Sequence, residues 1–477
     1  MIYVILTYIF YPFLYLVTLF KKSPFIPLYS TSHRRAWLFR RGTLKFPPLA
    51  KGGKGGFSDK SGKILIIQTA KIGDLICSTP VFREIKKKYP HVHLAVMVNP
   101  AAKELLEHNP YVNEVITINT KDYKGFPGKV KLSNIVRRGN YDIAICLNPN
   151  VLFAVATLWG LVPVRLGIMP TFCGATFKTA SGLYTHLVRH ESKRLVMETY
   201  MEMLKVIGIT GGDLTKEVYR SPGADEKVEE FFLKTICNKI PPNPPLPKGG
   251  IEESKSFALP LPKGGIEESK SFALPLPKEG IGEANQLIPP LKKGDGGGFS
   301  DKNILLIGIA VSSGNKLKEL GAEKLAVLAD SLIEQLQARV ILIGSENEKD
   351  TAVKILSLSK NKNAIIDSTG LFKLGELPAL IEKLSLFIGV DTGITYMADA
   401  LLVPVIDIAG PSDMNDQRPI GRNSIIIQKD FPCVPCSHAF NAPYSCKRVD
   451  RICITSVDVS EIVDAVKRLL QMSYNNT

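Results

Sequence analysis

The chain has 477 residues, an ordinary share of hydrophobic residues and a formal net charge of +15 at pH 7. This length suffices for two domains and additional segments. Residues 1–61 carry a net charge of +9, residues 239–302 carry +1, and the rest of the chain carries +5. A mildly basic globular part argues against a nucleic-acid-binding groove, and the basic N-terminus favours an anionic membrane surface. Eight cysteines in such a long chain do not indicate a disulfide-based scaffold.

Residues 1–20 form a hydrophobic segment that contains no charged residue. About 20 apolar residues can cross a bilayer as a helix, so we expect a hydrophobic membrane anchor here. Lys21 and Lys22 follow at once, and the positive-inside rule then keeps the rest of the chain on the cytoplasmic side of the inner (plasma) membrane. Pro12 and four tyrosines leave open an anchor that lies in the plane of the membrane, or a soluble hydrophobic arm.

Two stretches rich in Pro, Gly and Lys are expected to lack a packed core. The first, residues 21–62, is interpreted as a basic flexible linker. The second, residues 239–302, contains a 15-residue unit that begins at Leu246 and is repeated at once, ending at Pro275. Segments of this composition bury too little apolar surface to fold, so we interpret residues 239–302 as a disordered low-complexity insertion between two domains.

Residues 63–238 show short apolar runs that alternate with helical patterns, as in a doubly wound α/β domain with a parallel sheet. The first run, Ile64 to Ile67, is a predicted buried strand. Thr79 is expected to cap a helix that begins at Pro80. Further strands are expected at 93–98, 115–118 and 143–147, and further helices at 101–108 and 200–207.

Residues 303–477 repeat this alternation and predict a second domain of the same class. The expected strands are 304–311, 340–343, 364–367, 384–390 and 404–409, and the expected helices are 322–336, 349–359, 375–384 and 456–470. Two such domains in one chain place a cleft between the carboxyl ends of two parallel sheets.

Two turns carry the first candidate functional residues. The run that ends at Val390 is followed by Asp391-Thr392-Gly393 and a helical pattern. A strand, a polar turn with glycine and a helix N-terminus together make an anion site, and Asp and Thr side chains can hold hydroxyl groups. Asp74 follows the first strand, where a carboxylate can act as a general base. For both aspartates, a helix-capping role is the simpler alternative.

Several motifs resemble those of the ADP-heptose:lipopolysaccharide heptosyltransferase family, glycosyltransferase family 9. Residues Ile66 to Pro80 look like its N-terminal signature, and Phe387 to Ala400 with Gly410-Pro411-Ser412 look like its C-terminal signature. The turns Ser312 to Lys318 and Gly344 to Glu348 are similar to further family motifs. The resemblance implies an α/β fold of the GT-B type, with two Rossmann-like doubly wound domains facing a cleft. The N-terminal domain would bind the acceptor and the C-terminal domain the donor.

This resemblance covers residues 63–235 and 303–470. It implies an inverting, metal-independent glycosyltransferase that requires no cofactor. Such an enzyme would move heptose or a related sugar from a nucleotide-sugar donor, ADP-linked in this family, to a lipid-anchored saccharide acceptor such as lipopolysaccharide core. The implied partners are that donor, that acceptor and anionic lipids of the inner membrane, and not nucleic acid. The alternative is a catalytically silent nucleotide-sugar-binding or scaffold protein with the same fold.

Individual residues of this chain match the functional positions of the family. Asp74 matches the proposed base, and Lys318 matches the lysine that neutralises charge on the departing diphosphate, with Lys316 as an alternative register. Gly73 and Lys71 lie beside the base on the acceptor side. The positions that match donor-binding residues are Ser312, Ser313, Glu348, Asp391, Thr392, Gly393 and Tyr396, and the last of these stands where the family usually has a histidine.

Four cysteines lie close together near the C-terminus, at Cys433, Cys436, Cys446 and Cys453. The first pair has the spacing of metal ligands and the second pair does not. A structural zinc site, disulfides or redox use, and reduced cysteines in a loop all stay open as interpretations.

Histidines do not form an obvious constellation elsewhere in the sequence. His186 and His190 are four residues apart, which would place both on one face of a helix and make them a candidate metal pair. The alternative is that the basic residues around them, Arg189, Lys193 and Arg194, contact a phosphate of the acceptor.

Overall fold

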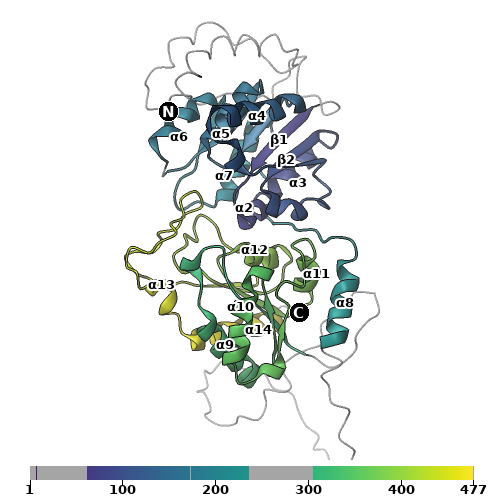
Figure 1. Cartoon of the computed structure of the whole chain (residues 1–477). Coiled ribbons are helices and arrows are strands. Elements are labelled where there is room, and N and C mark those ends of the chain that lie inside the picture. Colours follow the sequence, from purple (N-terminus) through teal and green to yellow (C-terminus); the bar gives the residue numbers. More distant parts are fainter. Residues whose placement is uncertain (1–6, 8–61, 172, 236–303, 476–477) are drawn as a thin grey trace, which may run out of the picture. The chain divides into compact units, whose positions relative to one another are not determined.

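The computed structural model in Figure 1 describes residue 7 and residues 62–171, 173–235 and 304–475. The predicted anchor at 1–20, the linker at 21–62 and the insertion at 239–302 therefore lie outside the described residues, except for residues 7 and 62. Contacts divide the chain into one unit of residues 1–228 and 304–477 and another of residues 229–303. The first unit contains two parallel sheets. Within the described residues, no helix is both long and apolar enough to cross a membrane.

The N-terminal sheet has six parallel strands in the order β3-β2-β1-β4-β5-β6. The order reverses between β1 and β4. Open α/β sheets bind ligands at the carboxyl ends of the strands at such a switch point. The strands are β1 (Lys63–Gln68), β2 (His93–Val98), β3 (Glu114–Thr117), β4 (Ile143–Cys146), β5 (Val164–Met169) and β6 (His186–Arg189).

The C-terminal sheet has six parallel strands in the order β12-β11-β10-β7-β8-β9. If its strands are numbered from one, read from the other edge, the order is 3-2-1-4-5-6, as in the N-terminal sheet. Its switch point lies between β7 and β10. The strands are β7 (Leu306–Ala310), β8 (Arg339–Ile343), β9 (Ile365–Asp367), β10 (Leu386–Val390), β11 (Val405–Ile408) and β12 (Ser424–Ile427).

Helices connect most consecutive strands in both sheets, as in βαβ crossovers. The exceptions are β2 and β3, which are joined by a 3-10 helix, and β11 and β12, which are joined by a loop. The α-helices are α2 (Ile72–Ile76), α3 (Thr79–Lys88), α4 (Gly125–Gly139), α5 (Val151–Trp159), α6 (Ala175–Ala180), α7 (Val196–Leu204), α8 (Ala224–Thr235), α9 (Ala322–Leu336), α10 (Lys349–Leu358), α11 (Leu377–Glu382), α12 (Gly393–Ala400), α13 (Ile452–Thr455) and α14 (Val459–Asn475). Short 3-10 helices lie at η2 (Pro100–Leu105), η3 (Thr120–Tyr123), η4 (Ser181–Leu183), η5 (Lys205–Ile207), η8 (Lys316–Lys318), η9 (Glu346–Glu348) and η10 (Lys362–Ala364).

The central strands form because their residues are apolar on both faces. All five residues of β10 are buried, and so are all residues of β1 after Lys63. A parallel sheet with helices on both faces needs such continuous apolar runs, because neither face meets water. The expected α/β architecture of two doubly wound domains is confirmed.

Several element boundaries differ from the prediction. Ser78, and not Thr79, is the residue that precedes α3, because the Thr79 hydroxyl donates a hydrogen bond back to the Ile76 carbonyl at the end of α2. The expected helix at 101–108 is only the 3-10 helix η2, which begins at a proline and ends well before Pro110. The expected helix at 200–207 begins earlier, at the start of α7, and ends as the 3-10 helix η5. The one expected at 456–470 is α14, which begins at Val459 and continues to Asn475.

The segment between η5 and α8 connects the two sheets by alternating contacts. The Arg83 guanidinium on α3 donates hydrogen bonds to the Thr215 carbonyl and the Glu217 carboxylate, both at 2.8 Å. Lys216, which lies between these two residues, instead donates to Asp399 Oδ2 on α12 at 2.6 Å. Lys216 is 1% exposed and Asp399 is 5% exposed. Neighbouring residues of this segment therefore bind to different domains: Thr215 and Glu217 to the N-terminal domain, and Lys216 to the C-terminal domain.

The core of the C-terminal domain provides a test of this packing. Leu328 on α9 is fully buried, whereas the adjacent Val327 is 55% exposed. We expect Leu328→Ala to destabilise the folded chain by about 2–5 kcal/mol, because it removes buried methyl groups and leaves a cavity. Val327→Ala, on the same helix, should change stability by less than about 0.5 kcal/mol. Urea denaturation of both variants measures the difference, and equal midpoints would contradict the assigned faces of α9.

Candidate functional site

A cavity of about 940 Å³ lies where the carboxyl ends of β1, β7 and β10 meet α2 and α12. These two helices, both labelled in Figure 1, contact each other. The residues predicted for the base, the donor and the acceptor side all line this cavity: Lys71, Gly73, Asp74, Ser312, Ser313, Lys318, Glu348, Asp391, Thr392, Gly393 and Tyr396. The fold therefore brings together residues that are more than 300 positions apart.

Two glycines allow α2 and α12 to approach each other closely. A Cβ atom on Gly393 would lie 2.7 Å from Ile72 Cγ2 and 3.0 Å from the Gly73 nitrogen. A Cβ atom on Gly73 would lie 3.0 Å from the Tyr396 ring. Carbon atoms cannot approach this closely without displacement, so side chains at these positions would separate the two helices. The glycines of both motifs therefore act at the same contact.

Asp74 is the third residue of α2 and lines the cavity. Its Oδ2 accepts a hydrogen bond of 3.1 Å from the Lys71 backbone N–H. Burial raises the pKa of Asp74 to about 6, and the charge of Asp391 raises it too, against the lowering effects of that hydrogen bond and of the Lys71 and Lys318 charges. A carboxylate with a pKa near neutrality is suited to general base catalysis. Asp74 lines the cavity and also caps its own helix. Its position is therefore compatible with both predicted roles, the general base and the helix cap.

Asp391 is held on both of its carboxylate oxygens. The Lys318 ammonium donates to Asp391 Oδ2 and, at 3.3 Å, to the Asp391 carbonyl. The Tyr396 hydroxyl donates to Oδ1. Burial, followed by the charge of Asp391, raises the pKa of Tyr396 well above 10, so this hydroxyl stays protonated and can serve as a donor. Lys316 is exposed and does not line the cavity, which favours the register that assigns Lys318.

Glu348 and Ser312 meet at the end of β7. The Ser312 hydroxyl donates to Glu348 Oε1, and the Ser345 backbone N–H and hydroxyl donate to Oε2 at 2.5 and 2.9 Å. Ser313 accepts a hydrogen bond of 3.3 Å from the Asn315 N–H. These are short polar side chains on turns, a composition suited to binding the hydroxyl groups and phosphates of a nucleotide.

Thr392 precedes the first residue of α12, but its side chain does not cap the helix. Thr392, Gly393 and Ile394 all line the cavity. The first N–H groups of a helix have no partner within that helix, and the helix dipole adds a partial positive charge there. The N-terminus of α12 can therefore receive an anionic group beside Lys318.

Asp407 is a buried carboxyl group that the sequence did not single out. It lies on β11, in register with Gly389 of β10, and is 0% exposed. Within the described residues, neither of its carboxylate oxygens has a hydrogen-bond partner. Burial raises its pKa well above 3.8, and the charge of Asp391 raises it further, which favours the neutral form. The apolar pattern of β11 did not indicate in the sequence that this carboxyl group would be buried without a hydrogen-bond partner.

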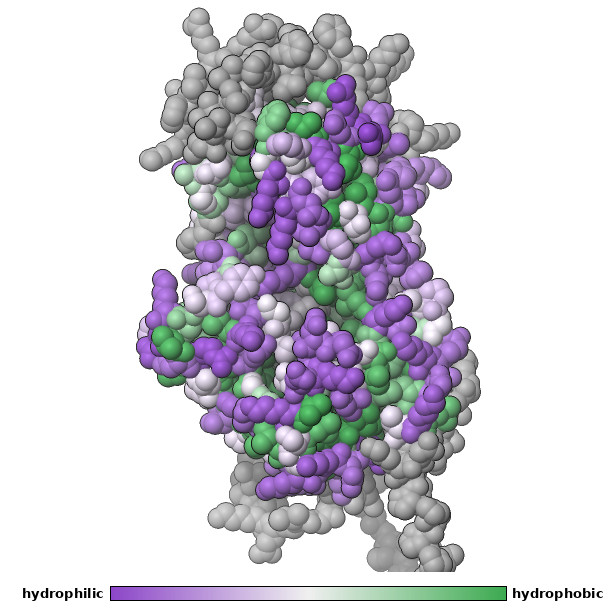
Figure 2. All heavy atoms as spheres, viewed as in Figure 1, coloured by the Kyte–Doolittle hydropathy of each residue, from purple (hydrophilic) through white to green (hydrophobic). Residues whose placement is uncertain are grey.

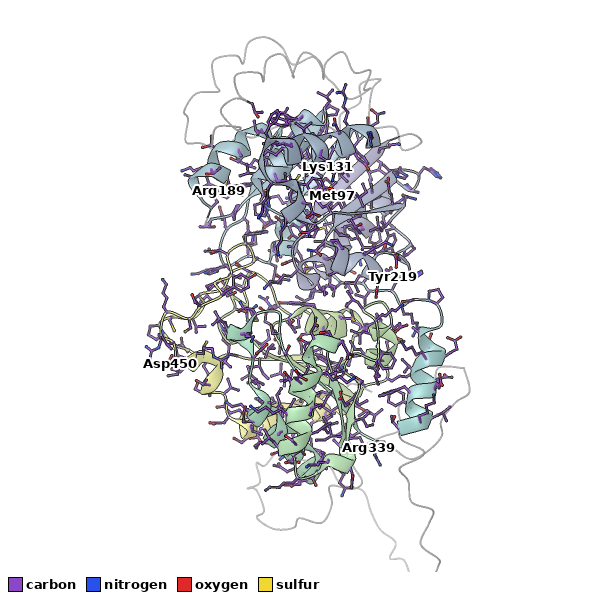
Figure 3. All side chains as sticks on the ribbon, in the orientation of Figure 1. Met97, Lys131, Arg189, Tyr219, Arg339 and Asp450 are labelled. Carbon is purple, nitrogen blue, oxygen red and sulfur yellow. The ribbon has the colours of Figure 1, made fainter. Side chains whose placement is uncertain are left out.

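The loop between β12 and α13 reaches the cavity as well. Tyr444 from this loop lines the cavity and the Lys71 ammonium lies 5.3 Å from its ring centroid, a cation–π distance. Asp450, from the same loop, is labelled at one edge of Figure 3. Nearby Val449 is 85% exposed, and Figure 2 shows hydrophobic atoms among hydrophilic ones in that region. In the sequence, only the cysteines of this loop indicated that it has a functional role.

The four cysteines of the loop region are free thiols. Cys433 and Cys436 are exposed, whereas Cys453 is buried. Burial, and then the neighbouring thiols, raise the pKa values of Cys436 and Cys453, which favours the protonated form over the thiolate that binds metals. Among the described residues, the group whose ligand atoms lie within 4.8 Å of one another contains no cysteine. The structural zinc site stays a prediction.

The predicted metal pair at His186 and His190 on a helix is wrong. His186 lies on β6 and His190 follows that strand, so no helix face unites them. Arg189, labelled in Figure 3, is exposed at the edge of the molecule in that view, and Arg194 pairs with Glu202. None of the basic residues from 189 to 194 lines the cavity.

The fold and the cavity define a glycosyltransferase-like protein of two Rossmann-like domains. A glycosyltransferase family 9 structure from Veillonella parvula superposes with a TM-score of 0.61 at 18% identity, covering 86% of this chain and 98% of that one. The structure of Escherichia coli ADP-heptose lps heptosyltransferase II gives a TM-score of 0.57 at 17% identity, covering 86% and 99%. At these identities, the likeness concerns the fold.

Sequence comparison finds similarity to the same kind of protein. The model of glycosyltransferase family 9 (heptosyltransferase) matches residues 272–444. Lipopolysaccharide heptosyltransferase 3 of Escherichia coli (strain K12) is 22% identical over 357 residues, which cover 74% of this chain and 84% of the relative. The chain is therefore similar to glycosyltransferase family 9, the heptosyltransferases, and this similarity supports a glycosyltransferase enzyme.

The close contact between α2 and α12 yields a prediction. Gly393→Ala should reduce sugar transfer by at least tenfold, because its Cβ would push Ile72 and the Asp74 helix away from the donor side. Gly174→Ala is the matched control, because a Cβ on Gly174 meets nothing within 4 Å and this residue lies outside the cavity. Steady-state transfer rates of both variants test this, and a fully active Gly393→Ala enzyme would show that the contact does not position the site.

Proposed function

We propose that this glycosyltransferase moves heptose or a related sugar from an ADP-linked donor to a hydroxyl group of a lipid-anchored saccharide such as lipopolysaccharide core. The observation that carries the proposal is that Asp74, with its raised pKa, shares one cavity with Lys318, Asp391 and Glu348. Two similarities support the donor and the acceptor. A solved E. coli heptosyltransferase of this fold, with a TM-score of 0.50, is in complex with ADP-2-deoxy-2-fluoro heptose, and the E. coli relative is a lipopolysaccharide heptosyltransferase.

In the proposed reaction, Asp74 takes the proton of the acceptor hydroxyl as its oxygen attacks the anomeric carbon of the sugar. The bond between that carbon and the diphosphate breaks at the same time, and the diphosphate leaves with the electron pair. Attack from the face opposite the leaving group inverts the anomeric carbon in a single displacement, so no covalent enzyme intermediate forms. Positioning of the two substrates supplies much of the rate.

The negative charge that develops on the leaving diphosphate would be stabilised by Lys318 and the first N–H groups of α12. Fixed positive groups at the position where charge develops are an effective form of catalysis, because they need no reorganisation. Lys318 is paired with Asp391. The diphosphate would therefore share this ammonium with Asp391, while Tyr396 keeps its hydrogen bond to the other oxygen of Asp391. Neither role requires a metal ion.

The nucleotide side of the donor would contact Glu348 and Ser312. A carboxylate binds the two hydroxyl groups of a ribose well, because each oxygen can accept one hydrogen bond. Both Glu348 oxygens accept hydrogen bonds from protein groups. A ribose hydroxyl would take the place of the Ser312 hydroxyl as the donor to Oε1.

The acceptor would be presented at the cytoplasmic face of the inner membrane. The support for this part of the proposal comes from the sequence, in which the uncharged residues 1–20 are followed by a basic segment. A hydrophobic anchor and a basic segment together bind anionic lipid surfaces more strongly than either does alone.

The decisive experiment offers the full chain a panel of ADP-, GDP- and UDP-sugars with a core-oligosaccharide acceptor and follows products by mass spectrometry. Transfer from one donor is expected, and Asp74→Asn should lower the rate by at least about 10²-fold, as loss of a general base does. Donor binding by the variant, measured by calorimetry, should be unchanged. Donor binding without turnover for any acceptor would instead support the catalytically silent binding protein.

The raised pKa of Asp74 sets the pH dependence of the reaction. The ionised carboxylate is the active form of the base, so kcat/KM should be level above pH 7 and fall about tenfold per unit below pH 6. Asp391→Asn removes a negative charge that raises this pKa, so the inflection should move to lower pH in that variant. A pH–rate profile without an inflection between pH 5 and 7 would contradict the assignment of Asp74 as base.

A further inference from the structure

A second polar cluster lies at the side of the cavity, separate from the groups assigned to sugar transfer. Asp413 and Asp416 follow β11, and His438 lies in the loop after β12. One ligand atom from each of these residues lies within 4.8 Å of the others. His438 Nδ1 is 3.1 Å from Asp413 Oδ2 and 3.5 Å from Asp416 Oδ2. Asp413 and His438 line the cavity, and Asp416 does not.

His190 from the N-terminal domain contacts this cluster through Asp416. It is 4% exposed, and its Nε2 lies 3.5 Å from Asp416 Oδ1, an ion-pair distance. Within the described residues, neither of these two buried atoms has a hydrogen-bond partner. The other ring nitrogen, Nδ1, shares a hydrogen bond of 2.9 Å with the Thr199 hydroxyl. Asp416 Oδ1 and His190 Nε2 thus form an ion pair without a hydrogen bond, although buried polar atoms are nearly always hydrogen-bonded.

Both carboxylates of the cluster are buried. Asp413 and Asp416 are 7% and 4% exposed. In the described ranges of the chain, the only basic side chains within 4.0 Å of these two carboxylates are His190 and His438. Buried carboxylates are normally paired with cations, because an isolated buried charge is very unfavourable.

The distances agree with those between the ligands of a bound metal ion. Nitrogen and oxygen ligands lie about 2.0–2.2 Å from such an ion, so adjacent ligands lie roughly 2.8–3.6 Å apart in tetrahedral or octahedral geometry. The two distances measured from His438 Nδ1, 3.1 Å to Asp413 and 3.5 Å to Asp416, lie in this range. An imidazole with two carboxylates suits first-row divalent metals better than calcium, which prefers oxygen ligands alone.

The surrounding groups orient the ligands in the way that metal sites require. The Ala439 N–H donates to Asp416 Oδ2 at 3.3 Å, and the Asn415 N–H donates to Asp413 Oδ1 at 3.0 Å. The Thr199 hydroxyl fixes the ring of His190. Second-shell hydrogen bonds of this kind hold the ligand atoms in place before the ion arrives.

We propose that Asp413, Asp416 and His438 bind a first-row divalent metal ion beside the cavity, with His190 contacting the other oxygen of Asp416. His190 belongs to the N-terminal domain and the three ligands belong to the C-terminal domain. The two segments already meet, because the Val196 N–H donates to the Asp416 carbonyl at 2.8 Å and the His190 ring packs edge-on against Phe440. The ion would fix the loop that carries His438 and Phe440 against the cavity, and it takes no part in breaking the sugar–phosphate bond.

Manganese binding to the full chain tests this site directly. Mn²⁺ is the appropriate probe because it prefers oxygen and nitrogen ligands to the thiolates of the cysteine loop. After chelator treatment and desalting, isothermal calorimetry should show one tight Mn²⁺ site per chain. Asp416→Asn and His438→Gln should each weaken this binding by at least tenfold, and His108→Gln, a change at an exposed histidine outside the cavity, should leave it unchanged.

Thermal unfolding gives a second readout that does not depend on activity. Mn²⁺ should raise the Tm of the parent chain and of His108→Gln, and should not raise that of Asp416→Asn or His438→Gln, because a ligand stabilises only the state that binds it. Circular dichroism checks that each variant is folded, and two independent variants keep the test valid if one is not. If the parent chain binds no Mn²⁺, or if all variants bind it equally, the proposal is wrong. A parent chain without Mn²⁺ binding and an Asp416→Asn variant of lowered Tm would identify a simple His190–Asp416 ion pair.

Discussion

The close contact between α2 and α12 is the constraint on which the site depends. Gly73 and Gly393 leave room for the two helix N-termini to meet, and a Cβ at Gly393 would lie 2.7 Å from Ile72. This contact also positions Asp74 and Asp391, because each lies within two residues of one of these glycines. The charge of Asp391 is then near enough to raise the pKa of Asp74. The same contact that joins the domains therefore adjusts the group proposed to accept the proton.

The segment around Lys216 reinforces this arrangement from the other side of α12. Lys216 pairs with Asp399, and its ammonium lies 5.4 Å from the centre of the Tyr396 ring. Asp399 also accepts hydrogen bonds from the Ile420 and Gly421 N–H groups. Breaking a buried ion pair by removing one partner is strongly unfavourable, because the other charge stays buried. The connecting segment thus anchors α12, which carries the residues assigned to the donor.

Much of this organisation could be predicted from the sequence, because it depends on local patterns. Continuous apolar runs such as the one at β10 indicate buried parallel strands, and the glycines and aspartates after β1 and β10 lie where a family motif is recognisable. The cluster of His190 with Asp416 could not be predicted in this way. Its members are 226 positions apart in the chain, and no local periodicity links a residue after β6 to one after β11. The same reason explains Asp407, since a single carboxyl in an apolar strand shows its environment only after the sheet has formed.

The neutral state of Asp407 has a consequence for the charge balance of the buried floor beneath the donor site. Three carboxyl groups, those of Asp391, Asp399 and Asp407, lie near two ammonium groups, those of Lys216 and Lys318. Since the pKa of Asp407 is raised, two negative charges offset two positive ones and the floor is close to electroneutral. A diphosphate bound at the proposed donor site would therefore share Lys318 with Asp391 and meet little surplus positive charge. Oriented backbone dipoles would then contribute to its binding beside Lys318, and salt weakens such buried dipoles less than it weakens exposed charges.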